Sequence, residues 1–323
     1  MANKVCRICN ELPLLSAAEQ HILVWKEMLA LLVKNREKFE QVCLRIRIAV
    51  TLLALLSAAG ALGAVALRLS PAAAADEGIK LPVLMYHAIM SDPARSGDYV
   101  ITPEAFRRDM EYIRDAGYET VVMEDIIAYV RSGAPLPEKP VMVTLDDGYY
   151  NNYLYAYPVL SELGMRAVLS VIGVEADRYT AEPDLHENYA HCTWDMLREM
   201  EESGVIELQN HSYDLHHIQK GYMGIGKKTG EELVAYRARL YTDLSRMQNR
   251  FCEELGFVPS TFTYPFGCAP ADSAVVLEEL GFQASLGTDG LTFYVTRDAE
   301  CLERIPRYNR TSAKSARSIL ESA

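Results

Sequence analysis

Two short runs in this chain have the residue types and spacing of a metal-dependent hydrolytic site. Asp146 and Asp147 stand together before Gly148, and His211 and His216 follow further along the chain. Neighbouring side chains at a strand end point in different directions, so one carboxylate can bind a cation while the other stays free beside it. One aspartate and two histidines supply three ligands and leave a position open for water, as in hydrolytic zinc sites. Asp-Asp-Gly alone is typical of a turn, but the two histidines favour a metal site.

These residues can meet only if neighbouring strands bring them to one edge. Short apolar runs predict strands at 82–86, 120–123, 141–145, 167–171, 206–209, 261–264 and 284–287. The intervening patterns predict helices at 102–116, 123–132, 230–255 and 270–280. This alternation is typical of a parallel α/β fold, and about seven units favour a barrel over an open sheet. The chemistry of such barrels gathers at the carboxyl ends of the strands, where the runs above lie.

The same strand ends carry a family resemblance. The chain resembles the polysaccharide deacetylases (carbohydrate esterase family 4, the NodB homology domain) in three motifs: Leu145-Asp146-Asp147-Gly148, His211-Ser212-x-x-x-His216 and Tyr264-Pro265-Phe266-Gly267. Leu84-Met85-Tyr86-His87 and the stretches Trp194-Asp195 and Glu207-Leu208-Gln209 are similar to that family as well. The resemblance covers roughly residues 80–312, in the order that the family requires. It implies a distorted (β/α) barrel of about seven strands that removes N-acetyl groups from sugars by metal-assisted hydrolysis.

The resemblance also implies roles for individual residues. Asp147, His211 and His216 match the metal ligands, and Asp146 matches the catalytic base. Phe266 occupies the position whose backbone N–H helps to hold the oxyanion. The implied cofactor is one divalent metal ion, expected to be zinc, with cobalt or nickel as alternatives. In this chemistry the base takes a proton from a water that the metal acidifies, and the hydroxide attacks the amide carbonyl.

The chain departs from the family pattern in three places. The two histidines stand five residues apart rather than four, which resembles the branch of biofilm poly-N-acetylglucosamine deacetylases. The arginine that usually precedes the third motif is missing from 259–263, and no histidine follows residue 217 to supply the family's late general acid. We therefore expect His87 to protonate the leaving amine, and Arg304 or Arg307 to orient Asp146.

Charge is divided unevenly along the chain. The 323 residues include 32 Lys and Arg against 44 Asp and Glu, for a net charge of −12, and half of them are hydrophobic, which excludes a wholly disordered chain. Residues 1–47 carry eight basic and five acidic residues, so the rest carries 24 and 39. That acidic remainder excludes a basic nucleic-acid-binding surface. We expect a polysaccharide rich in N-acetylglucosamine as partner, and no nucleic acid.

Residues 48–67 form an uncharged run flanked by Arg45, Arg47 and Arg68. Twenty helical residues span roughly 30 Å, the thickness of a bilayer core. The basic flank predicts a cytoplasmic N-terminus and an extracytoplasmic body. We therefore expect a single-pass protein of the cell membrane, or a secreted one if the chain is cleaved after Ala75. A buried soluble helix is the alternative.

The expected organisation follows from these boundaries. A largely helical cytoplasmic segment at 1–47, with Ser16 and Glu19 as a possible capping box, precedes the transmembrane anchor at 48–67. A linker at 68–80 leads to the deacetylase domain at 81–312, and a tail follows at 313–323.

Other residues leave alternatives open. The external cysteines Cys192, Cys252, Cys268 and Cys301 could form two disulfides, but their number fixes no pairing. The aromatic residues near the motifs could stack on sugar rings: Tyr149, Tyr150, Tyr153, Tyr213 and Trp194. For Trp194, packing in the core is an equal alternative.

Three functions compete. The first is a membrane-tethered N-deacetylase of peptidoglycan or an exopolysaccharide. The second is related chemistry on another substrate, as in an acetyl-xylan esterase-like O-deacetylase or a cyclic imide hydrolase. The third is a catalytically silent sugar-binding barrel, favoured by the missing arginine and late histidine but opposed by the complete set of base and ligands.

Overall fold

The computed structural model describes Lys26 and residues 78–323. The expected N-terminal helix, the anchor at 48–67 and most of the linker lie outside the described residues. Within the part that the structure describes, no helix has both the length and the apolar character needed to cross a bilayer.

Residues 78–323 form an α/β unit. Its strands are β1 Ile79–Lys80, β2 Val83–Tyr86, β3 Ala88–Ile89, β4 Val100–Ile101, β5 Glu119–Thr120, β6 Pro140–Leu145, β7 Ala167–Val171, β8 Ile206–Asn210, β9 Ile218–Gln219, β10 Tyr222–Met223, β11 Thr261–Thr263, β12 Ala284–Leu286, β13 Tyr294–Val295 and β14 Tyr308–Asn309. Its α-helices are α3 Pro103–Asp115, α4 Met123–Ser132, α5 Tyr157–Leu163, α6 Gly173–Ala181, α7 Trp194–Glu202, α8 Leu233–Leu255, α9 Ala274–Glu279 and α10 Ala316–Ser322. One turn of π-helix, Asn152–Ala156, leads into α5.

The central sheet is curled and parallel. Its strands are ordered β12-β11-β8-β7-β6-β2-β14, and β5 pairs with the beginning of β6. The order follows the chain from β2 to β12, and then β14 returns to pair with β2 through Tyr308 and Leu84. Just before β14, Ile305 bridges Leu286 of β12 and exchanges backbone hydrogen bonds with Ser285 and Gly287 at 2.8 Å. The segment before β14 therefore contacts one edge of the sheet while β14 pairs with the other, as in a distorted barrel.

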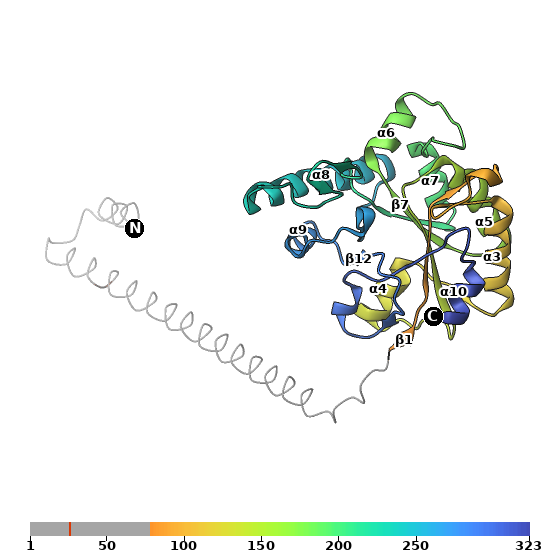
Figure 1. The fold of residues 1–323 in the computed structure, drawn as a ribbon. Helices are drawn as coiled ribbons and strands as arrows, with labels where there is room; N and C mark the ends of the chain where they lie inside the picture. Colours follow the sequence, from red (N-terminus) through yellow and green to blue (C-terminus); the bar gives the residue numbers. More distant parts are fainter. Residues whose placement is uncertain (1–25, 27–77) are drawn as a thin grey trace, which may run out of the picture. The chain divides into compact units, whose positions relative to one another are not determined.

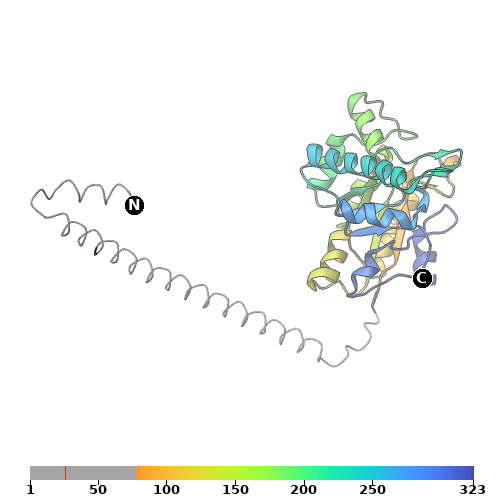
Figure 2. The ribbon, with the colours of Figure 1, turned by 90° about the vertical axis from the view of Figure 1, so that its left-hand side faces the viewer.

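The helices cover the outside of this sheet (Figure 1). Helix α3 begins where Thr102 Oγ1 accepts a hydrogen bond from the Ala105 N–H, with Pro103 in the first turn. Its Phe106, Met110 and Ile113 are fully buried, because apolar residues at this spacing share one helix face. Figure 2 shows α8 and α9 stacked on the side of the domain that faces the viewer.

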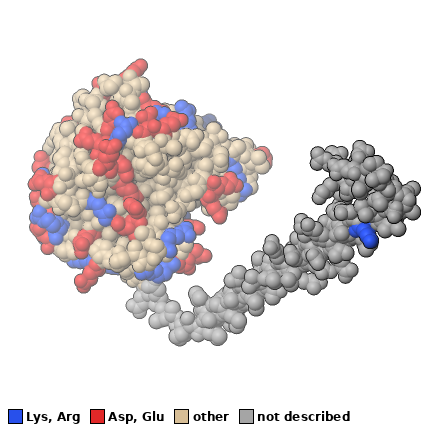
Figure 3. Space-filling model, turned by 180° about the vertical axis from the view of Figure 1, so that it is seen from behind, with Lys and Arg blue, Asp and Glu red and all other residues tan. Residues whose placement is uncertain are grey.

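The core is built from the faces of the parallel strands. The main cluster joins β2, β6, β7 and β8 to α3, α5 and α7. A second cluster joins residues of β2, β6, β7, β12 and β13 to α4. Strands that are buried on both faces have continuous apolar runs in their sequence. On the surface seen in Figure 3, acidic and basic side chains are interspersed.

The strands of the barrel were predicted close to their observed positions. The prediction at 120–123 is the least accurate, because β5 covers only Glu119–Thr120 and Met123 already opens α4. Strand β14, which is two residues long, was not predicted from the sequence. Residues of the expected linker form β1, which pairs with β13, and residues of the expected tail form α10, whose Ala316 N–H donates to Asp109 on α3 at 3.1 Å.

Candidate active site

The three expected metal ligands meet at the carboxyl ends of β6 and β8. Asp147 Oδ1 lies 3.4 Å from His211 Nε2 and 3.2 Å from His216 Nε2. One ligand atom from each residue lies within 4.8 Å of the others. Asp147 and His211 are buried, and His216 is partly exposed. The loop that follows β8 therefore places His216 beside His211, although the two residues are five positions apart in the sequence.

Local hydrogen bonds shape that loop. Asn210 Oδ1 accepts from the Ser212 N–H at 2.7 Å, and Ser212 Oγ accepts from the Leu215 N–H at 3.1 Å. Asp243 of α8 accepts from the N–H groups of Tyr213 and Asp214 at 2.9 and 2.8 Å. Asn210 and Asp243 could not be predicted as loop-shaping residues from the sequence, because their roles depend on backbone groups that only the fold brings near.

The electrostatics of the three ligands suit a cation. Burial raises the pKa of Asp147, but the contacts with His211 and His216 outweigh it and hold this pKa well below its usual range. Burial, with the charge of His211, lowers the pKa of His216 to about 4, so its ring is neutral at neutral pH. Burial lowers the pKa of His211, but the contacts with Asp147 and Asp146 outweigh it and raise this pKa. A carboxylate and a neutral imidazole are the forms that ligate metals, and Asp147 and His216 have these forms at neutral pH.

The residues present fit a metal ion. Asp147 Oδ1 is buried and accepts no hydrogen bond within the described part of the chain, which is costly unless a cation occupies the site. His211 Nδ1 lies 2.8 Å from the Thr263 carbonyl oxygen. An Nδ1–H donated to that carbonyl leaves the Nε2 lone pair free toward Asp147 and His216, which is the usual arrangement of a ligating histidine.

Asp146 stands next to the ligands but is held by Arg307. The Arg307 guanidinium donates to both carboxylate oxygens of Asp146, at 2.7 and 2.8 Å, and to Thr144 Oγ1 at 3.1 Å. Its Nε donates to the Gly287 carbonyl at 2.8 Å, and the residue is fully buried. Burial raises the pKa of Asp146, but the charges of Arg307 and His211 outweigh it, so this pKa lies below its ordinary value. The carboxylate is therefore ionised at neutral pH.

Arg304 or Arg307 was expected to orient Asp146, and the structure brings only Arg307 to it. Arg304 does not reach the site: its guanidinium is half exposed and donates to Asp289 Oδ1 at 2.9 Å. Arg307 lies immediately before β14, in the segment that connects both edges of the sheet. Arg307 therefore supplies the contact with Asp146 that was expected of one of these two arginines.

His87 follows β2 and approaches Asp146 from the side. Its Nε2 lies 4.0 Å from Asp146 Oδ2, and its ring packs edge-on against Tyr99 with 4.8 Å between centroids. Asn152 Nδ2 donates to the His87 carbonyl oxygen at 2.8 Å and fixes the backbone. Burial lowers the pKa of His87, although Asp146 and Asp147 partly oppose that effect.

Phe266 lies in the turn after β11, next to the expected metal ligand His216. Its ring stacks on His216 with 4.3 Å between centroids. Within the turn, the N–H groups of Gly267 and Cys268 donate to Tyr264 and Pro265. The left-handed backbone of Phe266, with φ 57°, sets the direction of its own N–H.

Backbone strain is concentrated at this rim. Among the described residues, the non-glycine residues in the left-handed region are Asp147, Ser212, Phe266 and Arg304, with φ of 74°, 73°, 57° and 52°. Each such residue costs about 1–3 kcal/mol, and such costs cluster at functional sites. Asp147, Ser212 and Phe266 come from three different strand ends, so the strain marks the place where those ends meet.

A pocket of about 700 Å³ opens over these groups. Its lining includes His87, Asp146, Asp147, His211, His216 and Phe266. Tyr149 also lines it and lies beside the His191 ring, with 4.8 Å between centroids. Its volume lies within the range of about 300–1,000 Å³ that is usual for small-molecule sites.

The other expected aromatic residues lie elsewhere. Trp194 is 1 % exposed and packs in the core, with Nε1 donating to Asp177 at 2.7 Å. Tyr213 is buried and also donates to Asp177, at 2.9 Å. Tyr150 and Tyr153 stack on each other outside the pocket lining. For Trp194, the structure therefore favours the alternative of core packing.

The four cysteines of the described region are free. Cys192 is buried and its Sγ donates to the Tyr149 carbonyl at 3.3 Å, while Cys252 is exposed on α8. The two disulfides that the residue count allowed are not formed in this structure.

Comparison with known proteins agrees with this geometry. A family model described as polysaccharide deacetylase matches residues 133–285. The chain is 27% identical over 243 residues to the poly-β-1,6-N-acetyl-D-glucosamine N-deacetylase of Escherichia coli K12, covering 69% of this chain and 35% of that protein. The chain thus spans about a third of the length of that relative.

Solved structures share the fold. A de-N-acetylase from Aggregatibacter actinomycetemcomitans is 22% identical, with a TM-score of 0.66, over 76% of this chain and 100% of that one. IcaB from Ammonifex degensii is 25% identical, with a TM-score of 0.61, over 76% and 97% of the two chains. Residues 133–285 thus match the polysaccharide deacetylase family, and the domain shares the fold of these two structures.

Proposed function

We propose that this chain is a metal-dependent hydrolase that removes N-acetyl groups from an N-acetylglucosamine-containing polysaccharide. The observation that carries the proposal is the pair of adjacent aspartates with separate partners. Asp147 contacts the two histidines, whereas Asp146 is held by Arg307 beside them. A binding module has no need for an ionised base next to a set of metal ligands.

Each residue of the site has a separate role in the proposed hydrolysis. A divalent ion held by Asp147, His211 and His216 would acidify a water molecule and polarise the acetyl carbonyl. Asp146 accepts the proton of the water as its oxygen bonds to the carbonyl carbon. The Phe266 N–H donates a hydrogen bond to the oxygen that becomes negative. The carbon–nitrogen bond then breaks, His87 gives a proton to the departing amine, and acetate and a free amino sugar result.

Zinc is the metal that the ligand set favours. Two imidazoles and one carboxylate with an open position are typical of catalytic zinc sites. Cobalt and nickel accept the same donors, so either could replace zinc when it is more available.

The substrate proposal rests on the relatives. The Escherichia coli relative is named for poly-β-1,6-N-acetylglucosamine, and the Aggregatibacter protein is titled a de-N-acetylase. Extracytoplasmic peptidoglycan or exopolysaccharide supplies the same N-acetylglucosamine units. The uncharged run at 48–67 supports a membrane tether that would hold the barrel beside such a polymer, with the N-terminus in the cytoplasm.

Acetate release separates this function from its competitors. The full chain, loaded with zinc, is incubated with poly-β-1,6-N-acetylglucosamine, with acetylated xylan and with a cyclic imide. We expect acetate and free amines from the first polymer, and loss of both after chelation. Preferential turnover of the xylan or the imide would reassign the substrate, and no turnover of any would support the silent barrel.

A further inference from the structure

A short hairpin directly follows the ligand His216. Strand β9 pairs with β10 through Ile218 and Met223, and through Gln219 and Tyr222. At its base, His217 Nε2 lies 2.8 Å from Tyr222 Oη, and the Gly224 N–H donates to the His217 carbonyl at 3.0 Å. The hairpin is therefore closed at its base by its own hydrogen bonds.

The apolar side chains of the hairpin are exposed although they line the pocket. Ile218 is 69 % and Met223 39 % exposed, and Phe266 beside them is 39 % exposed. Large apolar side chains left open to water in a ligand groove mark a binding surface. Within the catalytic pocket, these three residues supply an apolar area next to the polar ligands.

The hairpin is also fixed to the turn that carries Phe266. Gly224 has φ +55°, and a Cβ there would lie 2.7 Å from the Pro265 carbonyl oxygen and 3.4 Å from the Phe266 ring. Only glycine allows so close an approach. The hairpin and the turn that carries Phe266 are therefore in close contact at Gly224.

We propose that Ile218, Met223 and the Phe266 ring form a platform that binds the polymer units flanking the unit being deacetylated. This inference rests on the proposed function and adds how the site selects a polymer over a single sugar. The faces of a pyranose ring expose C–H groups, which pack against apolar side chains, while its hydroxyls stay in water. The exposed Ile218 extends the pocket outward, where the next unit of a chain must lie.

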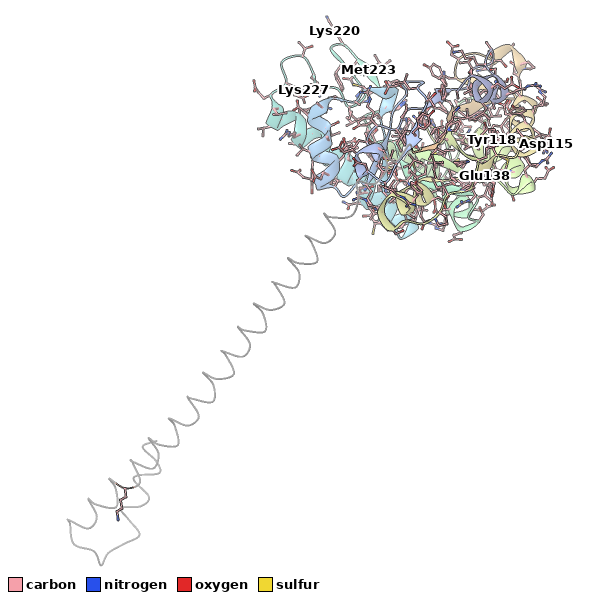
Figure 4. All side chains as sticks on the ribbon, turned by 90° about the horizontal axis from the view of Figure 1, so that it is seen from below. Asp115, Tyr118, Glu138, Lys220, Met223 and Lys227 are labelled. Carbon is pink, nitrogen blue, oxygen red and sulfur yellow. The ribbon has the colours of Figure 1, made fainter. Side chains whose placement is uncertain are left out.

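The platform is continuous with the catalytic pocket, which favours a sugar polymer over other ligands for this surface. Figure 4 shows Met223 with Lys220 and Lys227 on one projecting side of the domain, away from Asp115, Tyr118 and Glu138. Lysines beside apolar side chains also suit an anionic lipid surface. A lipid surface, however, would leave unexplained why Ile218 and Met223 line the same cavity as the metal ligands.

The test compares substrates of two lengths. Full-length wild type and the double variant Ile218→Ser/Met223→Ser are assayed on a β-1,6-linked N-acetylglucosamine pentamer and on the monomeric methyl glycoside. We expect the ratio of kcat/KM for pentamer to monomer to fall about tenfold in the variant, because two apolar contacts to the neighbouring unit are lost. Val234→Ser/Val258→Ser, which alters two exposed valines outside the pocket lining, should keep the wild-type ratio.

An unchanged ratio in the double variant would overturn the inference, as would an equal loss on both substrates. The single variant Met223→Gln repeats the test if the double variant does not fold. Loss of binding to anionic phosphatidylglycerol vesicles with an unchanged ratio would assign the hairpin to the membrane instead. If wild type releases no acetate from either sugar, it is the proposed function that fails.

Discussion

The bidentate contact between Arg307 and Asp146 is the interaction on which the chemistry of single residues depends most. Arg307→Met would leave a buried carboxylate without its partner, which typically costs about 3–5 kcal/mol. We expect the free energy of unfolding to fall by that order and acetate release to fall at least tenfold. Arg304→Met is the matched control, because the exposed pair with Asp289 is worth at most about 1 kcal/mol. Denaturant unfolding and acetate assays measure both, and equal effects of the two substitutions would refute the assignment.

His87 is the candidate acid, and its substitution separates proton transfer from metal binding. We expect His87→Ala to lower kcat by about 10²–10⁴-fold, the usual range for general acid–base assistance. Metal content should stay at the wild-type level, because His87 is not among the three ligands. His186→Ala changes an exposed histidine and serves as control. Wild-type turnover in His87→Ala would assign the acid to water or to another residue.

At the scale of the elements, two buried glutamates at the contact of α7, β8 and α4 make the stability of the folded domain depend on pH. Glu201 of α7 accepts from the Leu208 N–H of β8, and Glu207 of β8 accepts from the Glu124 N–H of α4. Burial raises the pKa of both Glu201 and Glu207 to about 7, well above the value of about 4.3 in an unfolded chain. Between these values the folded state binds more protons than the unfolded state, so stability falls as pH rises through this window.

We expect the free energy of unfolding to be about 1–3 kcal/mol lower at pH 8 than at pH 5, and Glu207→Gln to remove part of that fall. Urea unfolding at the two pH values measures it. The exposed Glu202→Gln is the control. The same fall in wild type and in both variants would show that other groups cause it.

The sequence predicted the elements that carry a repeated signal. Apolar runs such as 167–171 located β7 because a strand buried on both faces must be apolar throughout. The residues of β14, Tyr308 and Asn309, carry no such run, and pairing with β2 alone makes them a strand. The grouping of Asp147, His211 and His216 was predicted from residue type and spacing. The choice between Arg304 and Arg307 needed the path of the chain between the sheet edges.

At the scale of the whole molecule, the uncharged run at 48–67 predicts how the protein fractionates in the cell. We expect the full chain to sediment with membranes and to resist extraction at high salt. Deletion of residues 48–67 should move it to the soluble fraction, because roughly 30 Å of apolar helix is then lost. Immunoblots of both fractions test this. Full-length protein that is soluble, or that is released by salt alone, would contradict the anchor.

The central claim is that one aspartate is the base while its neighbour holds the metal. Elemental analysis and acetate release from poly-β-1,6-N-acetylglucosamine, measured on the same preparations of wild type, Asp146→Asn and His216→Ala, test it most directly. We predict one metal ion per chain in wild type and Asp146→Asn, with acetate release about 10²–10⁴-fold lower in Asp146→Asn, and loss of both metal and acetate release in His216→Ala. Wild-type acetate release by Asp146→Asn, or a full complement of metal in His216→Ala, would contradict the account.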